Sequence, residues 1–322
     1  MRPQAKFFSA SVPLFPVGWL FKERKSRVWD VVIATEDRFE SPSEDPFSRM
    51  TLEEEHLLMA ALEKRGLKVR RVSWSNPTFD WNTAASTVLR STWDYFVRKD
   101  EFLAWIEAVR TRTRLLNAAS LVTWNSDKRY LRDLEGRGIR IPPTRFLDPL
   151  APPDDLATLM RQSGWECAVL KPAVSAGAFE TFLLSRATPA TDWEAASHLV
   201  RLKPTLLQEY LPSIEVQGEL SIVFLGGRYS HAVRKRSACG DFRVQVQHGG
   251  QYAEAIPSAA DRELASQVIA TCAPAPVYAR VDFVQDEEGN SCLMELELIE
   301  PDLYCRLVPG SADRLADAII EG

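Results

Sequence analysis

The chain has 322 residues, of which 45% are hydrophobic, and a net charge of −5 at pH 7. A chain of this length is too long for a single small hydrophobic core, so two or three subdomains are expected. The hydrophobic content excludes a disordered chain. The negative charge argues against a nucleic-acid binder, and no apolar run is long enough for a membrane span. Five cysteines without a CxxC pair favour a reduced, cytoplasmic protein, and four scattered histidines give no zinc pattern.

Residues 1–27 are expected to form an amino-terminal extension. Arg2 and Lys6 precede the apolar run FFSASVPLFPVGWLF, which has the outline of a signal peptide. Pro13 and Pro16 interrupt this run, and no small-x-small cleavage site follows it. We therefore expect a segment that packs on the body or stays loose, and a signal peptide is the alternative.

An open α/β layer is predicted for residues 28–118. Val28–Thr35 is a β-branched apolar run, typical of a buried parallel strand. A helix is expected to start at Thr51, where Thr51 and Glu54 fit a capping box, and to end at Gly66. The remaining expected elements are strands Leu67–Trp74 and Thr87–Arg90 and a helix over Arg98–Arg112.

The segment VLRSTWDY closes the last strand of this layer. Arg90, Thr92 and Asp94 fall at the carboxyl end of the strand, where open α/β sheets place ligands. Arg90 is a candidate to hold a substrate carboxylate in a bidentate fork, with Asp94 beside it. An ordinary Arg–Asp ion pair that caps the loop is the alternative.

A lysine at the start of a helix is the first notable feature of residues 119–209. Asn125, Ser126 and Asp127 favour a cap before a helix within Thr123–Leu134. Lys128 then falls in the first turn, where a cation is unfavourable for the helix dipole unless it faces a phosphate. The other elements expected here are strands Gly138–Thr144, Cys167–Pro172, Phe179–Ser185 and Thr205–Tyr210 and helices Asp154–Ser163 and Thr191–Leu202.

The strand that ends at Lys171 leads into a loop of small and polar residues, Val174–Thr181, in which only Gly177 is glycine. Such a loop lets backbone N–H groups approach a phosphate closely. The Walker pattern GxxxxGK[ST] is absent. A plain hairpin turn is the alternative.

Cations are concentrated early in residues 210–322. The expected strand Arg228–Arg236 carries four of them, and the loop Cys239–Gly250 adds Arg243. A cationic strand beside an acidic hairpin suggests bound anions, and a solvated basic edge that discourages strand pairing is the alternative. The other elements expected are strand Gly218–Phe224 and helices Ser258–Ala270 and Ala312–Ile320.

An acidic hairpin is predicted within Tyr278–Pro301, where two apolar runs flank the turn DEEGN. Side chains alternate along a strand, so Arg280 shares a face with Asp282, and Glu295 shares a face with Glu297. Half-buried carboxylates are costly unless they are paired or bind metal, and this set suits Mg2+. An exposed strand face with salt bridges is the alternative. By the same alternation, the Glu300 side chain is expected to point to the opposite face from Glu295 and Glu297, so it is not expected to join the set.

Taken together, the order and spacing of these stretches resemble the ATP-grasp superfamily of carboxylate–amine ligases. Within it, the chain is most similar to the group with the cyclo-ligase that forms D-cycloserine from O-ureido-D-serine. The matching stretches are LRSTWDY, WNSDKRYL, LKPAVSAGA, LQEY, GELSIVF, GDFRVQVQHGG, ARVDF and LMELELIEP. They cover nearly the whole chain beyond the extension.

The resemblance implies an ATP-grasp fold of α/β (α+β) class with three subdomains, at residues 28–118, 119–209 and 210–322. It implies ATP and Mg2+ as cofactors, with Mn2+ as the substitute.

Lys128 and Lys171 resemble the lysines that hold phosphates, and Ser175, Ala176 and Gly177 resemble the loop over them. Gln208, Glu209, Tyr210 and Leu211 resemble the adenine hinge, and Glu219 or Glu215 the ribose-binding acid. Asp282, Glu295 and Glu297 match the metal ligands. Arg280, Arg236 and Lys171 match the groups beside the transferred phosphoryl.

The implied reaction activates a small, amino-acid-like carboxylate as an acylphosphate and joins it to a nitrogen nucleophile, with release of ADP and phosphate. The substrate is expected near Arg90, Asp94 and Arg243. Relatives of this kind are often dimers, so a homodimer is an expected assembly, and neither nucleic acid nor membrane is an expected partner. Two alternatives are a nucleotide-binding protein without turnover and a small-molecule kinase on the same fold. Glu297 departs from the family, which usually has Asn there.

Overall fold

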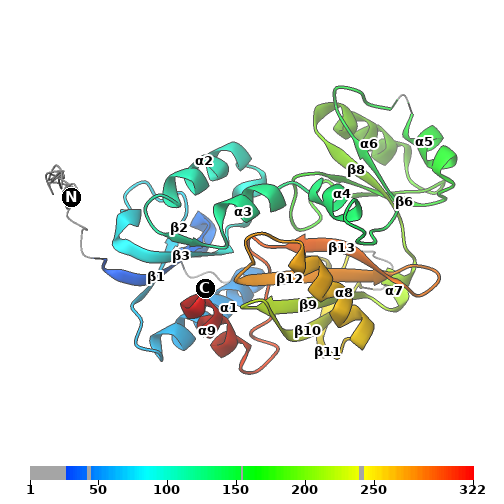
Figure 1. Cartoon of the computed structure of the whole chain (residues 1–322). Coiled ribbons are helices and arrows are strands. Elements are labelled where there is room, and N and C mark those ends of the chain that lie inside the picture. Colours follow the sequence, from blue (N-terminus) through cyan, green and yellow to red (C-terminus); the bar gives the residue numbers. More distant parts are fainter. Residues whose placement is uncertain (1–26, 42–44, 154, 239–242) are drawn as a thin grey trace, which may run out of the picture.

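The computed structural model describes residues 27–41, 45–153, 155–238 and 243–322. The predicted extension, except for Arg27, and residues 239–242 of the basic loop lie outside these ranges. Three β-sheets carry the described part of the chain, and helices cover them (Figure 1). None of the helices in these ranges has the length and apolar character needed to cross a membrane.

The first sheet is parallel, in the order β2-β1-β3-β4. Its strands are β1 (Trp29–Thr35), β2 (Val69–Ser73), β3 (Ala84–Ser91) and β4 (Arg114–Leu116), and helices α1 (Pro46–Glu63) and α2 (Lys99–Val109) belong to the same layer. Short 3-10 helices are η1 (Asp37–Phe39), η2 (Trp81–Thr83) and η3 (Trp93–Phe96). The strands are buried because both faces are covered, which explains their β-branched apolar sequences.

Helix α1 begins five residues earlier than the capping box predicted. Asp45 is the N-cap and accepts a hydrogen bond from the Ser48 backbone N–H at 2.8 Å, and Pro46 occupies the first helical position. Thr51 lies inside the helix and donates to a carbonyl of the preceding turn. Glu54 also lies inside the helix, and its carboxylate accepts from backbone N–H groups far along the chain. Both predicted cap residues therefore have other roles.

The second sheet is antiparallel, in the order β5-β8-β6-β7, and lies at the opposite end of the molecule from β1 (Figure 1). Its strands are β5 (Thr144–Leu147), β6 (Ala168–Pro172), β7 (Phe182–Leu184) and β8 (Thr205–Glu209), with helices α5 (Leu156–Ser163) and α6 (Ala190–Leu202). Strand β5 starts where the predicted strand Gly138–Thr144 was expected to end. Pro142 and Pro143 precede it, and neither has the N–H that a ladder requires.

Helix α4 (Tyr130–Glu135) lies within the stretch Thr123–Leu134 in which a helix was predicted, and a second short helix, α3 (Ala119–Asn125), precedes it and was not predicted. Asn125 does not cap a helix start. Its side-chain amide donates to the Leu296 carbonyl at 2.7 Å, and its side-chain oxygen accepts from the Leu298 N–H at 2.8 Å. Lys128 consequently lies in the turn between α3 and α4, fixed by a hydrogen bond from its N–H to the Ala173 carbonyl at 2.7 Å.

The third sheet is antiparallel, in the order β11-β10-β9-β12-β13. Its strands are β9 (Glu219–Leu225), β10 (Arg228–Arg236), β11 (Gln251–Ala255), β12 (Tyr278–Gln285) and β13 (Ser291–Glu297), with helices α7 (Ser213–Val216), α8 (Ala259–Ala270) and α9 (Ser311–Glu321) and the 3-10 helix η4 (Val246–His248). Helix α8 lies across this sheet (Figure 1). Strand β11 follows directly after the predicted loop Cys239–Gly250 and was not predicted, because its side chains are mostly exposed and give no apolar alternation.

One hydrophobic cluster joins the first and third sheets. It combines Val31 and Leu58 of the amino-terminal layer with Val223, Val233 and Leu315 of β9, β10 and α9. Helices α1 and α9 also lie side by side at this junction (Figure 1). The acidic hairpin β12–β13 is therefore fixed against the amino-terminal layer as well as within its own sheet.

Candidate active site

A cavity of about 630 Å³ is lined by residues of the second and third sheets, by helices of the amino-terminal layer and by the loops around them. Its polar part lies over the hairpin β12–β13. An apolar part is lined by Tyr210, Leu211 and Met294, and aromatic side chains of the amino-terminal layer close another side. A cavity of this size, with a few charged groups on largely apolar walls, has the properties of a ligand site.

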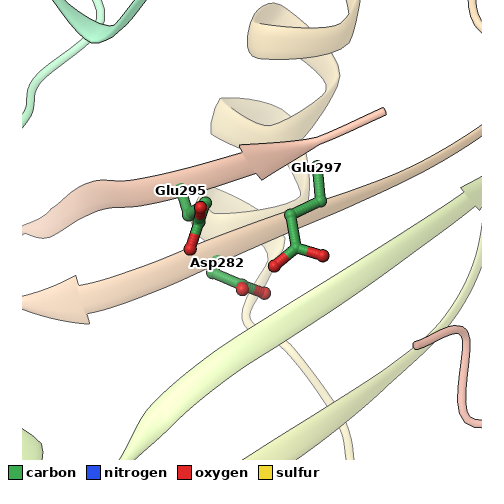
Figure 2. Close-up of side chains that lie close together, drawn as sticks. All are labelled: Asp282, Glu295 and Glu297. Carbon is green, nitrogen blue, oxygen red and sulfur yellow. The ribbon is translucent and has the colours of Figure 1, made fainter. Parts of the chain in front are cut away.

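The three predicted metal ligands are brought together on one face of the hairpin (Figure 2). Asp282 and Glu295 are cross-strand partners, and Glu297 lies opposite Arg280. One carboxylate oxygen from each of Asp282, Glu295 and Glu297 lies within 4.8 Å of the other two. Asp282 is fully buried, whereas the side chains of Glu295 and Glu297 are 32% and 26% exposed and line the cavity.

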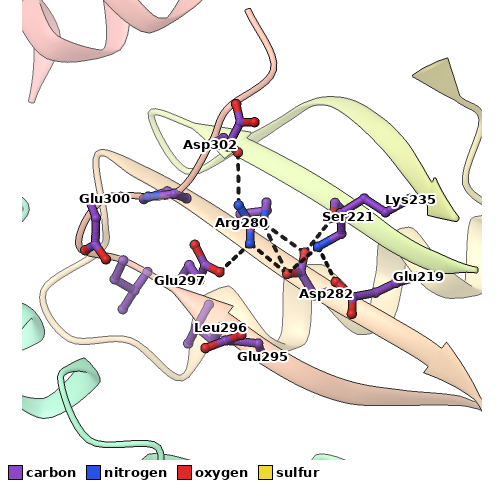
Figure 3. Close-up of polar contacts among 12 residues, drawn as sticks. Glu219, Ser221, Lys235, Arg280, Asp282, Glu295, Leu296, Glu297, Glu300 and Asp302 are labelled. Carbon is purple, nitrogen blue, oxygen red and sulfur yellow. Dashed lines mark hydrogen bonds and ion pairs between the residues drawn. The ribbon is translucent and has the colours of Figure 1, made fainter. Parts of the chain in front are cut away.

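Cations hold Asp282 in its ionised form (Figure 3). Burial alone would raise the pKa of its carboxyl, but the charges of Arg280 and Lys235 outweigh burial and lower the pKa. Arg280 donates to both carboxylate oxygens, at 3.0 and 3.1 Å, and Lys235 donates at 3.1 Å. Ser221 adds a hydrogen bond at 2.7 Å. The Arg280 guanidinium also pairs with Glu297, so it serves two of the three carboxylates.

Lys235 was not predicted, whereas its neighbour Arg236 was. The Lys235 side chain is buried, lines the cavity, and forms an ion pair with Glu219 across the ladder of β10 and β9. Arg236 is exposed and does not line the cavity, because adjacent residues of a strand point to opposite faces. The cation that this strand supplies to the acidic site is therefore Lys235. The alternation of charged and apolar residues along the strand was the available signal.

Lys128 and Lys171 both line the cavity. The Lys128 ammonium donates to Glu295 at 2.9 Å and to the Ser175 carbonyl at 2.6 Å. The Lys171 ammonium donates to the Gln208 side chain at 3.2 Å. Burial lowers the pKa of Lys171, the charge of Glu295 opposes this shift, and the charge of Lys128 adds to it. Two lysines in one low-dielectric cavity favour an anion between them.

The loop Val174–Thr181 forms one wall of the cavity, and Ser175, Ala176 and Gly177 all line it. Ala178 and Glu180 have positive φ values of 59° and 50°, which residues with a side chain adopt at some cost. Phe179 packs against Phe96 of η3, with ring centroids 5.1 Å apart. The loop is thus attached to the amino-terminal layer by an aromatic contact.

The predicted adenine hinge lies at the apolar part of the cavity. Gln208, Glu209, Tyr210 and Leu211 all line it. Of the two acids considered for ribose, Glu219 lines the cavity, and burial raises its pKa to about 7 although Lys235 acts against this shift. Glu215 lies outside the lining and accepts a hydrogen bond from the Tyr210 hydroxyl at 2.5 Å.

The three residues predicted to bind substrate separate in the structure. Arg243 lines the cavity, but Arg90 and Asp94 do not. Arg90 is buried beneath the site, where one guanidinium nitrogen donates to the Pro301 carbonyl at 2.8 Å. Asp94 accepts from the Trp74 indole N–H at 2.7 Å and pairs with Arg98 at 2.9 Å. Arg90 is the last residue but one of β3 and Asp94 follows the strand, so a place at the carboxyl end of the strand brought neither side chain into the cavity.

The same segment contributes aromatic residues instead. Trp93, Tyr95 and Phe96 of η3 line the cavity together with Phe47 of α1. The rings of Trp93 and Phe47 lie 5.2 Å apart between centroids. This aromatic wall was not predicted, although the high density of aromatic residues in LRSTWDYF was an available signal.

Glu300 was predicted to point to the opposite face from Glu295 and Glu297 and so away from the site. In the structure it is buried and lines the cavity. Strand β13 ends at Glu297, so residues 298–300 no longer alternate between faces. Burial raises the pKa of the Glu300 carboxyl, and the negative charge of Glu297 raises it further. Its side chain lies on the same side of the hairpin as Glu297 (Figure 3).

Two family models match the chain. The amino-terminal domain of D-cycloserine synthetase DcsG matches residues 31–117, and the ATP-grasp domain of prokaryotic glutathione synthetase matches residues 153–286. Among curated proteins, the cycloserine biosynthesis protein DcsG of Streptomyces lavendulae is 32% identical over 286 residues. That alignment covers 82% of this chain and 92% of the relative.

Solved structures agree with this similarity. The crystal structure of D-cycloserine synthetase DcsG superposes with a TM-score of 0.77 at 26% identity and covers 90% of this chain and 98% of that chain. D-alanine–D-alanine ligase from Bacillus anthracis, complexed with ATP, has a TM-score of 0.62 at 15% identity, with coverage of 91% and 96%. The ATP-grasp ligase PsnB, complexed with a precursor variant, Mg and ADP, has a TM-score of 0.59 at 16% identity, with coverage of 91% and 99%. The last two show likeness of fold.

Proposed function

Because the chain belongs to the ATP-grasp ligases, in the family of D-cycloserine synthetase, we propose that its cavity joins the carboxylate of a small amino-acid-like substrate to a nitrogen nucleophile at the expense of ATP. The class, an ATP-dependent carboxylate–amine ligase, follows from membership of the family. The observation that carries the assignment to this cavity is that Asp282, Glu295 and Glu297 line it together with Lys128 and Lys171.

The acidic face of the hairpin has the donor chemistry that Mg2+ prefers. Three carboxylates converge within 4.8 Å, and Arg280 and Lys235 offset part of their charge. We infer that Asp282, Glu295 and Glu297 hold Mg2+. A magnesium ion bound there would neutralise the charge of the β- and γ-phosphates during transfer.

In the proposed reaction, a substrate carboxylate oxygen bonds to the γ-phosphorus of ATP, and ADP leaves. The nitrogen nucleophile then attacks the acyl carbon of the acylphosphate, loses a proton, and displaces phosphate. Lys128 and Lys171 would hold the phosphate oxygens, and Arg280 would stabilise the transferred group. The enzyme positions groups and offsets charge, and no covalent bond to a protein side chain is required.

Residues around the reacting groups have supporting roles in this proposal. Tyr210 and Leu211 would contact adenine, and Glu219 would contact the ribose hydroxyls. The loop Val174–Thr181 would exclude water while the acylphosphate exists, because water hydrolyses such a species. Arg243 would contact the substrate from the basic loop.

The test is release of ADP and of phosphate by the full chain with a panel of D- and L-amino acids. We expect wild type to release both in equal amounts and to require Mg2+. Glu295→Gln and Lys171→Ala should lower kcat/KM for ATP by about a hundredfold or more. The matched controls are Glu288→Gln, on the exposed turn of the same hairpin, and Lys68→Ala, at an exposed lysine, which should behave as wild type.

Two outcomes would contradict the proposal. Release of ADP without free phosphate would indicate a kinase rather than a ligase. Unchanged ATP binding and unchanged Mg2+ dependence in both Glu295→Gln and Lys171→Ala would remove the nucleotide site from this cavity.

A further inference from the structure

Three side chains fix the backbone of residues 299–301, directly after the acidic hairpin. The Tyr278 hydroxyl lies 2.9 Å from the first carbonyl oxygen of this segment, the shortest of its three carbonyl contacts. Trp93 donates to the second carbonyl oxygen at 3.2 Å, and Arg90 to the third at 2.8 Å. Consecutive carbonyl groups each accept a hydrogen bond from a buried or half-buried donor. The side chain of Glu300 is therefore presented to the cavity from a rigid support, as a positioned ligand-binding group requires.

The Glu300 carboxyl is buried, and one of its oxygens has no hydrogen-bond partner among the residues that the structure describes. The residue is 7% exposed, and its Oε2 atom is buried with no hydrogen-bond partner. Within the described ranges, no lysine, arginine or histidine forms an ion pair with it. Burial of a carboxyl group without a partner costs free energy, so its presence here requires an explanation.

The neighbouring carboxylates of the hairpin are compensated. Glu295 pairs with Lys128, Glu297 pairs with Arg280, and Asp282 pairs with both Arg280 and Lys235. Glu300 lies beside this group, and the charge of Glu297 acts on it unfavourably. A cation supplied from outside the protein would complete the balance of charge at this end of the cavity (Figure 3).

The charges of two internal cations, Lys128 and Arg90, act favourably on Glu300, and because Lys128 is paired with Glu295, the remaining internal candidate is Arg90. One of its guanidinium nitrogens, Nη1, is also buried without a hydrogen-bond partner. However, its other terminal nitrogen is committed to the Pro301 carbonyl, its guanidinium lies 5.6 Å from the centre of the Tyr278 ring, and Arg90 does not line the cavity. The alternative is that Glu300 forms a structural ion pair with Arg90, and the experiment must distinguish this pair from binding of an external cation.

We propose that Glu300 binds the ammonium group of the substrate, so that the site selects an amino acid with a free, positively charged nitrogen. This inference rests on the proposed function and names the substrate class of that same site. Trp93 and Tyr95 line the cavity on the side of Glu300, and aromatic rings attract cations. A carboxylate that meets an ammonium in a buried site gives strong discrimination against analogues that lack the charge.

The experiment compares an amino acid with its 2-hydroxy-acid analogue in the wild type and in Glu300→Gln. The amino acid is the one from the D and L panel that gives the fastest ADP release. We expect Glu300→Gln to raise its KM about tenfold or more, because one partner of a buried charge pair is lost. The hydroxy acid should be an equally poor substrate for both proteins, so the preference for the ammonium collapses.

Three controls accompany this comparison. Glu300→Asp keeps the charge and should recover part of the preference. The KM for ATP and the Mg2+ concentration for half-maximal rate should stay within about twofold of wild type, because the nucleotide and metal residues are untouched. Glu288→Gln, on the exposed turn, should match wild type throughout.

Calorimetric titration of the same amino acids into the enzyme–AMPPNP complex gives a readout that needs no turnover. Binding by the wild type that is lost in Glu300→Gln supports the inference even if no ADP is released and the proposed function fails. Equal binding by both proteins, or no binding by the wild type, overturns it. A lower Tm in Glu300→Gln with an unchanged ammonium preference would also overturn it, in favour of the pair with Arg90.

Discussion

Two adjacent residues of strand β10 show how much depends on the direction of one side chain. Lys235 is buried between Glu219 and Asp282, whereas Arg236 is exposed on the other face. Lys235 shares its face with the acidic hairpin because β10 pairs with β9, and β9 pairs with β12. A charge that offsets buried carboxylates contributes to function only from this face.

We predict that Lys235→Met lowers kcat/KM for ATP by about a hundredfold, because Asp282 and Glu219 lose a shared cation in a buried site. Arg236→Met, one residue away, should stay within about threefold of wild type, because surface charges contribute little. The measurement is ADP release at saturating Mg2+, with thermal unfolding as the check on folding. Equal loss in both variants would show that the face of the strand does not matter.

His231, on the same strand, predicts a dependence of stability on pH. It is buried, its ring is within hydrogen-bond distance of the Leu303 carbonyl at 2.8 Å, and burial lowers its pKa to about 4. The unfolded chain takes up a proton near pH 6.5, whereas the folded protein does not until about pH 4. Stability from this residue is therefore complete above pH 6.5 and is lost as pH falls toward 4, by up to about 3 kcal/mol.

The check is urea unfolding of the wild type and His231→Gln at pH 7.5, 6.0 and 5.0. The difference in free energy of unfolding between the two proteins should shrink as pH falls, because only the wild type carries the buried neutral imidazole. A constant difference over this range would contradict the assignment.

At the scale of elements, the turn before β9 sets the register that brings Lys235 and Glu219 together. Gly218 has a φ of +75°, and a Cβ at this position would lie 2.2 Å from the Lys235 carbonyl oxygen. Strand β9 can therefore pass close to β10 only with glycine here. Gly227, in the turn between β9 and β10, has a φ of +71° but open space around the position of a Cβ.

We expect Gly218→Ala to cost about 3 kcal/mol or more of stability, because both the clash and the positive φ oppose it. Gly227→Ala should cost about 1 kcal/mol, since only the backbone conformation opposes it. Denaturant unfolding of the two variants measures the difference. ATP binding should weaken in Gly218→Ala alone, and similar values for both variants would exclude the close approach as the cause.

The elements also show what the sequence could and could not predict. The alternation predicted correctly that Arg280 shares a face with Asp282 and that Glu295 shares a face with Glu297, because residues 280–282 pair in regular register with residues 295–297 and the register shift falls only after Asp282. Alternation failed for Glu300, which lies beyond the end of β13, and a place at the carboxyl end of β3 did not bring Arg90 into the cavity. Side-chain direction there depends on contacts between layers, such as that between Trp93 and the Glu300 carbonyl, which no local pattern encodes.

For the whole molecule, Glu54 is a link between the first layer and the last segment of the chain. Its carboxylate accepts from the Cys305 N–H at 2.6 Å and the Arg306 N–H at 3.0 Å, and it pairs with the Arg306 guanidinium at 3.2 Å. All of these groups are buried or half-buried. Helix α1 thereby fixes the segment that follows the acidic hairpin.

We predict that Glu54→Ala lowers the free energy of unfolding by about 3 kcal/mol, because two backbone donors and one arginine lose their acceptor. Arg65→Ala removes the pairs with Asp313 and Asp317 between α1 and α9, which are exposed, and should have a much smaller effect. Urea unfolding followed by tryptophan fluorescence distinguishes them. A smaller loss in Glu54→Ala than in Arg65→Ala would show that the surface pairs hold the layers together.

The contact between Phe96 and Phe179 has a consequence for the order of events in a catalytic cycle. Phe179 belongs to the loop proposed to cover the phosphates, and Phe96 belongs to the layer that carries the aromatic wall beside Glu300. Departure of ADP requires the loop to move, and this movement breaks the contact. A ligand bound against the aromatic wall would strengthen the contact between Phe96 and Phe179 and so keep the loop closed over ADP. The ligation product should therefore leave the enzyme before ADP does.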